Sequence, residues 1–405
     1  MKKLFIILMA MTMLPTMRSV VACTTIIISG KATKDGRPLM WKNADTDNLN
    51  HRLIYSDRSG YPLIGVARSS SPDEHTASIW IGTNSEGFSI MNTLSYNLTN
   101  DRDASRNGSL MRRALEKCRN VADFKHFLDT LSRPMKVEAN FGVIDAEGNA
   151  AYFETYTNGY HIVDVNDPAI APQGYLVYTN FSYNGFYEAG EGYIRYLSTQ
   201  RLIARQAPAR DYSPQWIFTD VARSYYHSLM DVDFRSEEAL RLFSHGYIPD
   251  SDFIPRKSTA SSTVVQGVRK GERPELTTMW VIPGYPPCSV ALPSWVKAGN
   301  DNPPLLMKYD DKNTSRLCDW ALAAKEEVFP VKRGHGQSYL DMTKLYNKEG
   351  TGYIQKLAPV EARVFGMITP LLAAWREAGS VDREELKAAA KAVSDYVEQS
   401  LAEVR

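Results

Sequence analysis

The first apolar run of the chain is short and lies at its very start. Residues 4–14 (LFIILMAMTML) are apolar, follow two lysines, and are followed by small residues up to Cys23. A membrane span needs about 20 apolar residues, so this run is too short to cross one, and its charged start is typical of an export signal. We therefore predict a signal peptide over residues 1–22 and an exported protein, periplasmic or extracellular, with no integral membrane segment once the signal is removed.

Residues 23–95 contain short runs of β-branched and apolar residues between clusters of turn-forming residues. TTIIIS and PLMWKN flank the turn Lys34–Pro38, which has Asp-Gly at its centre, and the sequence predicts a second hairpin turn at Asn84–Gly87. Because these runs are short and rich in residues that favour strands, they predict one β layer. The expected strands are RLIYS, PLIGVA, ASIWIGT and GFSIMNT in addition to the first two.

Helical and extended patterns alternate in the rest of the chain. Ser109 is expected to cap a helix over 110–118, and Pro134 to end a second helix. Residues 285–304 hold five prolines with little periodicity, which indicates a surface crossing or lid. The other expected elements are strands over 136–145, 149–155, 160–165, 174–181, 262–270 and 276–284, and helices over 197–205, 215–228, 236–243, beyond about 317, and from about 382.

This order of elements predicts an α+β fold of stacked antiparallel sheets flanked by helices. We expect one domain over residues 23–316 and a helical C-terminal extension over 317–405 packed on that domain. A chain of this length can bury a large core. The sequence leaves the oligomeric state open, a homo-oligomer included.

Charge and cysteine content exclude several classes of function. Lys and Arg number 47 against 46 Asp and Glu, so the net charge of +1 gives no electrostatic reason to bind nucleic acid. The four cysteines are too few for a disulfide scaffold, and whether Cys288 and Cys318 pair in an oxidising compartment stays open. No zinc, P-loop or EF-hand motif occurs, so we expect neither a metal nor a cofactor.

Cys23 carries the strongest candidate chemistry. If the chain is cut before it, the mature protein begins with a thiol and an α-amine on one residue. An ordinary thiol has a pKa of about 8.5 and an α-amine one of about 7.7–8.0, so the amine can take the thiol proton near neutral pH. The thiolate can then attack a carbonyl, and the protonated amine can protonate the departing nitrogen.

A second interpretation explains the same cysteine. Residues 20–23 (VVAC) also resemble a bacterial lipobox, in which the cysteine is lipidated and its amine acylated. Such a protein would be anchored through Cys23 and would have no free amine to act as a base. Lipoproteins usually place a polar tether after the cysteine, whereas here TTIIIS continues directly into a buried-type strand. The sequence therefore favours the nucleophile.

Cys-Thr-Thr, the Asp-Gly hairpin and the segment Trp41–Asp45 (WKNAD) together resemble the N-terminal-nucleophile hydrolases of linear amides. This superfamily includes choloylglycine hydrolase, penicillin V acylase, isopenicillin N acyltransferase-like enzymes and a group of secreted dipeptidases. The resemblance covers residues 23–45 best and scattered positions to about Pro283. It implies an αββα sandwich with Cys23 at the end of an inner strand.

The resemblance also implies site residues. Asp45 matches the carboxylate that orients the amine and thiol, and Lys42 stands where bile salt hydrolases have an arginine. Asn180, in Tyr-Thr-Asn-Phe, matches an oxyanion-hole asparagine, and Asn92 is a second candidate whose spacing differs from the bile salt hydrolase pattern. Arg195 resembles a late arginine that braces the site. Each has an ordinary alternative, since asparagine and aspartate often cap turns and Arg195 could be a solvated residue at a helix start.

These observations predict an exported cysteine amidohydrolase that cleaves a small acyl-amide substrate through an acyl-thioester on Cys23. The acyl group, the leaving amine, and the choice between hydrolysis and acyl transfer stay open. The aromatic segment Phe181–Tyr196 could form an acyl pocket or could only stiffen a loop. The alternatives are a secreted dipeptidase of the same superfamily and a non-catalytic lipoprotein anchored at Cys23.

Overall fold

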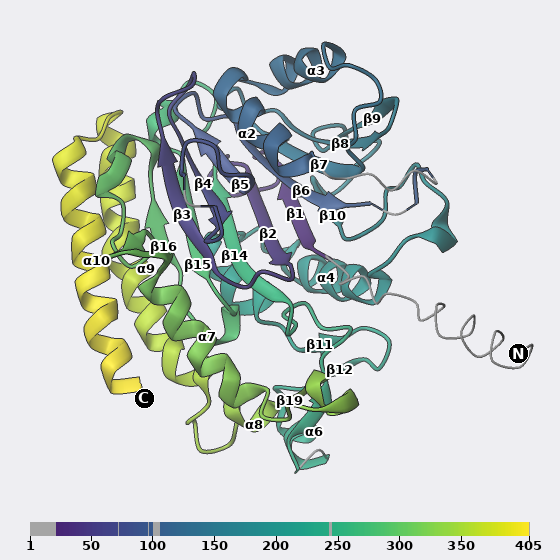
Figure 1. Ribbon diagram of the computed structural model, residues 1–405, viewed down its shortest axis with the longest axis vertical. Coiled ribbons are helices and arrows are strands. Elements are labelled where there is room, and N and C mark those ends of the chain that lie inside the picture. The colour runs from purple at the N-terminus through teal and green to yellow at the C-terminus, as the bar shows by residue number, and fades with distance from the viewer. Residues whose placement is uncertain (1–21, 72, 96, 100–105, 243–244, 405) are drawn as a thin grey trace, which may run out of the picture.

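The computed structural model describes residues 22–71, 73–95, 97–99, 106–242 and 245–404 (Figure 1). Two antiparallel sheets of six and seven strands lie face to face, with helices on the outer face of each. The predicted α+β fold, an αββα sandwich with helices at the C-terminal end, is confirmed. Apart from Ala22, the expected signal peptide lies outside the described residues.

The six-stranded sheet carries the start of the expected mature chain on an inner strand. Cys23 comes directly before β1, whose five residues are all buried, and β1 lies between β10 and β2. Gly36 has a φ of +74° in the turn between β1 and β2, a conformation that glycine adopts without strain, so the predicted hairpin is confirmed. In spatial order the strands are β10 (Tyr175–Tyr178), β1 (Thr24–Ile28), β2 (Leu39–Asp45), β14 (Thr259–Gln266), β15 (Thr278–Pro283) and β16 (Leu292–Ser294).

The seven-stranded sheet is a meander in which each strand pairs with the next along the chain. The single β layer expected over residues 23–95 is wrong, because the first two strands belong to the six-stranded sheet and the next four to this one. The predicted turn at Asn84 is confirmed: the Gly87 amide donates to the Asn84 carbonyl at 3.0 Å, and the Asn84 side chain accepts from the Phe88 amide at 3.1 Å. The strands are β3 (His51–Ser56), β4 (Leu63–Arg68), β5 (Ile79–Asn84), β6 (Ser89–Leu94), β7 (Ala139–Ile144), β8 (Ala150–Tyr156) and β9 (Gly159–Asp164).

Two helices, α2 (Asn107–Lys117) and α3 (Val121–Asp129), cover the outer face of the seven-stranded sheet (Figure 1). Phe124 packs edge-on against Phe153 at 5.0 Å, within a separate apolar core beneath these helices. Ser109 does not cap α2. The helix begins two residues before it, and the Ser109 hydroxyl donates to the Arg106 carbonyl inside the first turn.

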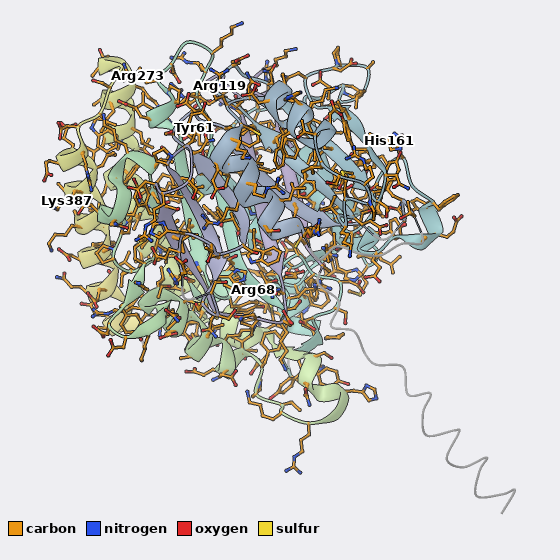
Figure 2. The ribbon with its side chains drawn as sticks, turned by 45° about the horizontal axis from the view of Figure 1, so that its top comes forward. Tyr61, Arg68, Arg119, His161, Arg273 and Lys387 are labelled. Carbon is orange, nitrogen blue, oxygen red and sulfur yellow. The ribbon has the colours of Figure 1, made fainter. Side chains whose placement is uncertain are left out.

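The outer face of the six-stranded sheet is covered by the remaining long helices, and Lys387 of α10 extends outward from this layer (Figure 2). The helix expected over 215–228 is wrong beyond Ala222, because β11 begins at Tyr226. The helices are α4 (Tyr193–Gln206), α5 (Pro214–Trp216), η2 (Ile217–Ala222), α6 (Glu237–Leu242), α7 (Arg316–Val328), α8 (Met342–Leu345), α9 (Tyr353–Ala378) and α10 (Arg383–Val404).

Short elements complete the fold between these helices. They are the pairs β11 (Tyr226–His227) with β12 (Val232–Asp233), β13 (Tyr247–Pro249) with β19 (Tyr339–Asp341), and β17 (Lys308–Tyr309) with β18 (Lys312–Ser315), and the single turns η1 (Tyr187–Ala189), η3 (Pro274–Leu276), η4 (Pro286–Cys288), η5 (Val296–Asp301) and η6 (Gly334–Ser338).

The proline-rich segment 285–304 is not a surface crossing. Most of it is buried, because β16 joins the sheet and Trp295 packs edge-on against Trp375 of α9 at 5.7 Å. The prolines break the periodicity that would have revealed these core positions. Cys288 is buried here, and both it and Cys318 are free thiols in the structure.

Within the described part of the chain, α9 is the helix long and apolar enough to cross a membrane by length and composition. Core helices pass the same test. In this fold α9 packs against the sheet, and its Glu361 forms a buried ion pair with Arg223 at 2.6 Å.

Candidate active site

Cys23 lies buried at the point where the chain enters β1. Its exposed fraction is 5%, and that of Ala22 before it is 1%. The Cys23 carbonyl accepts a hydrogen bond of 2.8 Å from Nη1 of Arg195, which also donates to Oγ1 of Thr24 at 2.7 Å. The start of β1 is thus fixed from the side by a buried guanidinium.

Asp45 ends β2 and is 1% exposed. Its Oδ2 accepts from Nε and Nη2 of Arg256, at 3.1 and 2.6 Å, and its Oδ1 accepts from the Thr259 hydroxyl at 2.6 Å. The sheet register places Thr259 opposite Asp45 and brings Arg256 within reach. Burial opposes the charge on Arg256, but Asp45 outweighs it and raises the pKa of Arg256. Nη2 of Arg256 also approaches the Ala22 carbonyl at 3.4 Å.

Lys42 is a buried cation on β2. Its Nζ donates to Oδ1 of Asn92 at 2.8 Å and to the Trp80 carbonyl at 3.0 Å. Burial lowers the pKa of Lys42, while the negative charges of Cys23 and Asp45 act in the opposite direction. The lysine is therefore close enough to both residues to interact with them, and it holds Asn92 at the same place.

Asn180 and Arg195 form a second connected pair. Oδ1 of Asn180 accepts from Nη2 of Arg195 at 2.9 Å, and its Nδ2 donates to the Leu94 carbonyl at 3.0 Å. Gly192, with a φ of +83°, caps α4, and a Cβ atom there would lie 2.4 Å from Nη2 of Arg195. Glycine therefore leaves the room that this guanidinium occupies. Burial, with repulsion from Arg256, lowers the pKa of Arg195 to about 10.

All six residues selected from the sequence lie in one buried region, and the structure adds Arg256 and Thr259. Three cations, Lys42, Arg195 and Arg256, interact with the Asp45 carboxylate, and Asp252 and Asp250 also act on the two arginines. Buried cations in a site stabilise negative charge that develops during a reaction. The arrangement therefore suits a thiolate attack that passes through an oxyanion. In the described part of the chain, no group of three or more His, Cys, Asp or Glu side chains is arranged to hold a metal ion.

The aromatic segment 181–196 lies beside this region. The Phe181 ring is tilted against that of Tyr193, with ring centres 4.8 Å apart, and meets Tyr196 edge-on at 5.2 Å. Glu154, which is fully buried, accepts from the amide of Tyr183 at 2.6 Å and so fixes the loop. The described rings pack on one another, which agrees with stiffening, while Phe186 is 74% exposed at the outer end.

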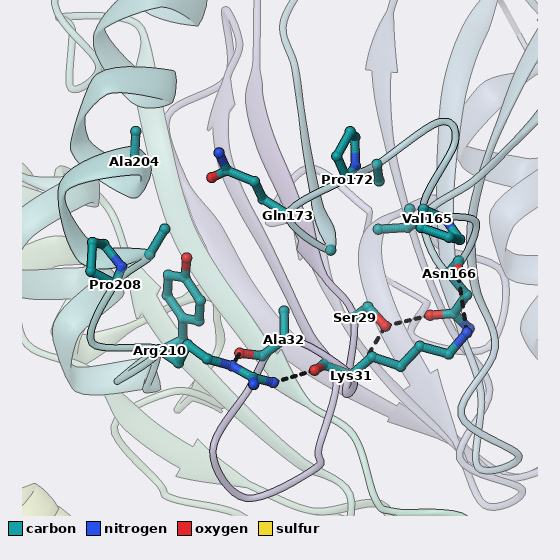
Figure 3. A pocket seen from close by; sticks show the side chains of 15 residues that line it. Ser29, Lys31, Ala32, Val165, Asn166, Pro172, Gln173, Ala204, Pro208 and Arg210 are labelled. Carbon is teal, nitrogen blue, oxygen red and sulfur yellow. Dashed lines mark hydrogen bonds between the residues drawn. The ribbon is translucent and has the colours of Figure 1, made fainter.

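An open cavity of about 620 Å³ lies elsewhere (Figure 3). It is lined by Ser29, which follows β1, whereas Cys23 precedes that strand. At about 3.3 Å per residue the two positions are on the order of 20 Å apart. The guanidinium of Arg210, at the edge of this cavity, donates hydrogen bonds to main-chain carbonyls, including that of Ala32 at 3.0 Å. This cavity is therefore separate from the Cys23 site.

Comparison with family models identifies the family of the chain. The model of the family described as acyl-coenzyme A:6-aminopenicillanic acid acyl-transferase matches residues 32–239, about half of the chain. The chain belongs to this family and thereby to the N-terminal-nucleophile superfamily of amidases and acyltransferases, so the predicted resemblance is confirmed. The match includes Lys42, Asp45, Asn92, Asn180 and Arg195, and it leaves out Cys23 and Arg256.

Several solved structures are similar to the chain at low identity. One is an N-acylethanolamine-hydrolyzing acid amidase ortholog of Caenorhabditis elegans (16% identity, 60% of this chain and 92% of that chain, TM-score 0.37). Another is a variant of conjugated bile acid hydrolase from Clostridium perfringens (12% identity, 67% of this chain and 92% of that chain, TM-score 0.39). A third is penicillin V acylase from Agrobacterium tumefaciens (11% identity, 67% of this chain and 85% of that chain, TM-score 0.36). No curated protein sequence matches the chain.

Proposed function

We propose that this protein is an exported cysteine amidohydrolase that cleaves the linear amide bond of a small N-acyl substrate, with Cys23 as its nucleophile. The observation that carries the proposal is the position of Cys23. It is the residue before an inner strand, and it is buried near the Asp45 carboxylate and the cations Lys42, Arg195 and Arg256. Amidases and acyltransferases of the superfamily need a nucleophile, a base and oxyanion donors, and this region offers all three.

The geometry around Ala22 supports the α-amine of Cys23 as the base. Nη2 of Arg256 contacts both Asp45 and the Ala22 carbonyl, so a cut after Ala22 would release the amine beside that carboxylate. Asp45 can then orient the amine by accepting a hydrogen bond from it. Because Ala22 is 1% exposed, a signal peptidase would have to cut before the chain folds.

The proposed reaction has two steps. The amine takes the thiol proton, the sulfur bonds to the substrate carbonyl carbon, and the carbonyl oxygen becomes an oxyanion, to which we assign the side-chain amides of Asn180 and Asn92 as donors. The C–N bond then breaks, and the protonated amine passes its proton to the departing nitrogen. In the second step the amine deprotonates a water, which attacks the acyl-thioester and releases the carboxylic acid and the thiol.

The burial of Cys23 argues against the lipid-anchor interpretation. A lipidated cysteine must be at the surface with a tether behind it, whereas the chain enters β1 at the next residue and Arg195 holds the Cys23 carbonyl. A catalytic cysteine, in contrast, can act with its main chain buried. We therefore propose export without a lipid anchor.

Two measurements test the proposed function. Intact mass of the exported protein should show a chain that begins at an unmodified Cys23. A panel of N-acyl amides and dipeptides should identify a substrate, with Cys23→Ala abolishing turnover while circular dichroism stays unchanged. Cys118→Ala, which removes a buried free thiol in the other core, is the matched control and should keep activity. Full turnover by Cys23→Ala would refute the mechanism, and a diacylated Cys23 would establish the lipoprotein instead.

A further inference from the structure

The turn before β14 carries Arg256 into the site, and a buried lysine of α7 forms a hydrogen bond with the main chain of this turn. Lys325 is 3% exposed, and its Nζ donates a hydrogen bond to the carbonyl of Lys257, the residue after Arg256. The contact joins two segments that lie 68 residues apart in the chain. Neither segment lies within the range matched by the family model.

Lys325 has an unusual environment for a cation. Its ammonium lies 5.2 Å from the ring centre of Tyr285 and 5.9 Å from that of Phe329, and no carboxylate of the described residues forms an ion pair with it. Burying a charge without an ion pair costs free energy. Stability alone therefore does not explain a lysine at this position.

The groups that face Lys325 come from three elements. Asp250 and Lys257 belong to the turn, Tyr285 and Cys288 to the segment around η4, and Glu326 to its own helix. Asp250 is a buried carboxylate. Burial raises its pKa, and the Lys257 amide, Arg256 and Lys325 oppose that shift.

Lys257 is fixed at both of its main-chain polar groups. Its amide donates to Oδ2 of Asp250 at 2.5 Å, and its carbonyl accepts from Lys325. The neighbouring amide of Arg256 donates to the Thr259 hydroxyl at 2.9 Å, and that hydroxyl contacts Asp45. The direction in which the Arg256 side chain leaves the turn is therefore set by these anchors.

We propose that Lys325 is a positioning residue of the active site: by holding the Lys257 carbonyl, it keeps the Arg256 guanidinium on Asp45 beside Cys23. The expected effect on catalysis rests on the proposed function, whereas the expected effect on the position of Arg256 does not. Misplacement of a catalytic group by about 1 Å can cost on the order of a hundredfold in rate. Removing the hydrogen bond between Lys325 and the Lys257 carbonyl should cause a part of that loss in rate.

The charge of Lys325 gives the anchor a pH dependence. Burial lowers the pKa of Lys325 to about 8, so the ammonium is lost above that pH and the remaining neutral amine is a weaker donor. The unfolded chain still binds this proton up to about pH 10.4, so the free energy of unfolding rises between these two values. Activity should fall over the same range in which this lysine's contribution to stability increases.

The test uses the mature protein and two readouts. Lys325→Met should lower kcat roughly tenfold with little change in KM, and should remove the decline in kcat near pH 8, because the titrating group is gone. Hydrogen exchange of residues 250–259, corrected for intrinsic rates, should become faster. Lys325→Arg keeps its charge over the whole range, so it should restore part of kcat and move the decline to higher pH.

Lys332→Met is the matched control. Lys332 is an exposed lysine that also donates to a main-chain carbonyl, that of Phe329 at 2.9 Å, and it should leave both readouts unchanged. Wild-type exchange in Lys325→Met would overturn the inference. If Lys325→Met does not fold, exchange of the wild-type turn at pH 7 and pH 9.5 decides, and equal protection overturns it. Faster exchange in a protein that hydrolyses no amide would refute only the proposed function.

Discussion

Arg256 donates two hydrogen bonds to one oxygen of Asp45, from Nε at 3.1 Å and from Nη2 at 2.6 Å. The same Nη2 lies 3.4 Å from the carbonyl that precedes Cys23. One planar group thus joins the carboxylate of the site to the bond whose cleavage would create the nucleophile. Three donor directions in one plane are a property of arginine that lysine cannot reproduce.

Arg256→Lys should therefore lose activity although it keeps the charge. We expect kcat/KM to fall on the order of a hundredfold, since removing one well-placed donor from an active site has that effect. Arg256→Gln should lose more, because it also removes the ion-pair partner of the buried Asp45. Arg269→Lys, at an exposed arginine that pairs with Glu272, is the control and should behave as wild type. Steady-state kinetics on the mature enzyme checks all three, and an active Arg256→Lys would contradict the assigned geometry.

Arg256 also shows why the sequence revealed only part of the site. Asp45 and Lys42 lie in the hairpin segment that carries the family resemblance, so the resemblance was enough to select them. Arg256 follows a proline in a loop without a motif, and it reaches Asp45 only because β14 pairs with β2 in a register that places Thr259 opposite Asp45. That register depends on long-range packing, which the residues near Arg256 do not encode.

The two asparagines should differ in their effect on the rate. Asn180 is held by Arg195 and by the Leu94 carbonyl, and Asn92 by Lys42. If both donate to the oxyanion, each alanine variant should raise the activation barrier by about 3 kcal/mol. This change lowers kcat roughly a hundredfold and should leave KM little changed. Asn180→Ala should cost more, because it also leaves a buried arginine with one partner fewer.

Asn97→Ala serves as the control for these variants, because Asn97 is a buried asparagine that bonds Ser182 of the aromatic loop instead. Single-turnover kinetics separates the acylation step from product release. An alanine variant that raises KM and leaves kcat unchanged would show that the asparagine binds substrate in its ground state rather than the oxyanion.

The buried contacts of residues 285–304 also explain why the sequence wrongly predicted a surface crossing there. Proline and the absence of periodicity indicate an exposed loop in most sequences, but here Glu361 of α9 accepts from the amide of Ala291 at 2.7 Å and so satisfies the buried backbone. The partner of that backbone lies 70 residues away. The α+β order of elements could be predicted from short-range pattern, while a buried irregular segment depends on such distant partners.

The Arg223–Glu361 ion pair should contribute strongly to stability when only one partner is removed. It is bidentate, at 2.8 and 2.6 Å, and both side chains are less than a tenth exposed. Glu361→Gln should lower the free energy of unfolding by about 3–5 kcal/mol, because a buried arginine loses its counterion. Glu398→Gln breaks the exposed pair with Arg316 and should cost less than about 1 kcal/mol. Urea unfolding gives both values, and equal effects would refute the role of burial.

His51 should make the protein sensitive to acid. It is 1% exposed, its Nδ1 lies 2.9 Å from the Ser261 hydroxyl, and its Nε2 has no hydrogen-bond partner among the described residues. Burial, with repulsion from Arg68 and Lys42, lowers its pKa to about 3. The unfolded chain therefore binds a proton below pH 6.5 that the folded chain does not, and this group removes stability as the pH falls from 6.5 toward 3. From pH 6.5 to pH 5 the loss should be about 2 kcal/mol.

His51→Gln should reduce this loss, because glutamine does not titrate. His161→Gln is the matched control, since His161 is an exposed histidine of β9 at the outer surface (Figure 2). Urea unfolding at pH 5 and at pH 6.5 should show a smaller difference in unfolding free energy for His51→Gln than for the wild type, and an unchanged one for His161→Gln. The same difference in all three proteins would mean that His51 is protonated in the folded state, and that an acceptor reaches its Nε2.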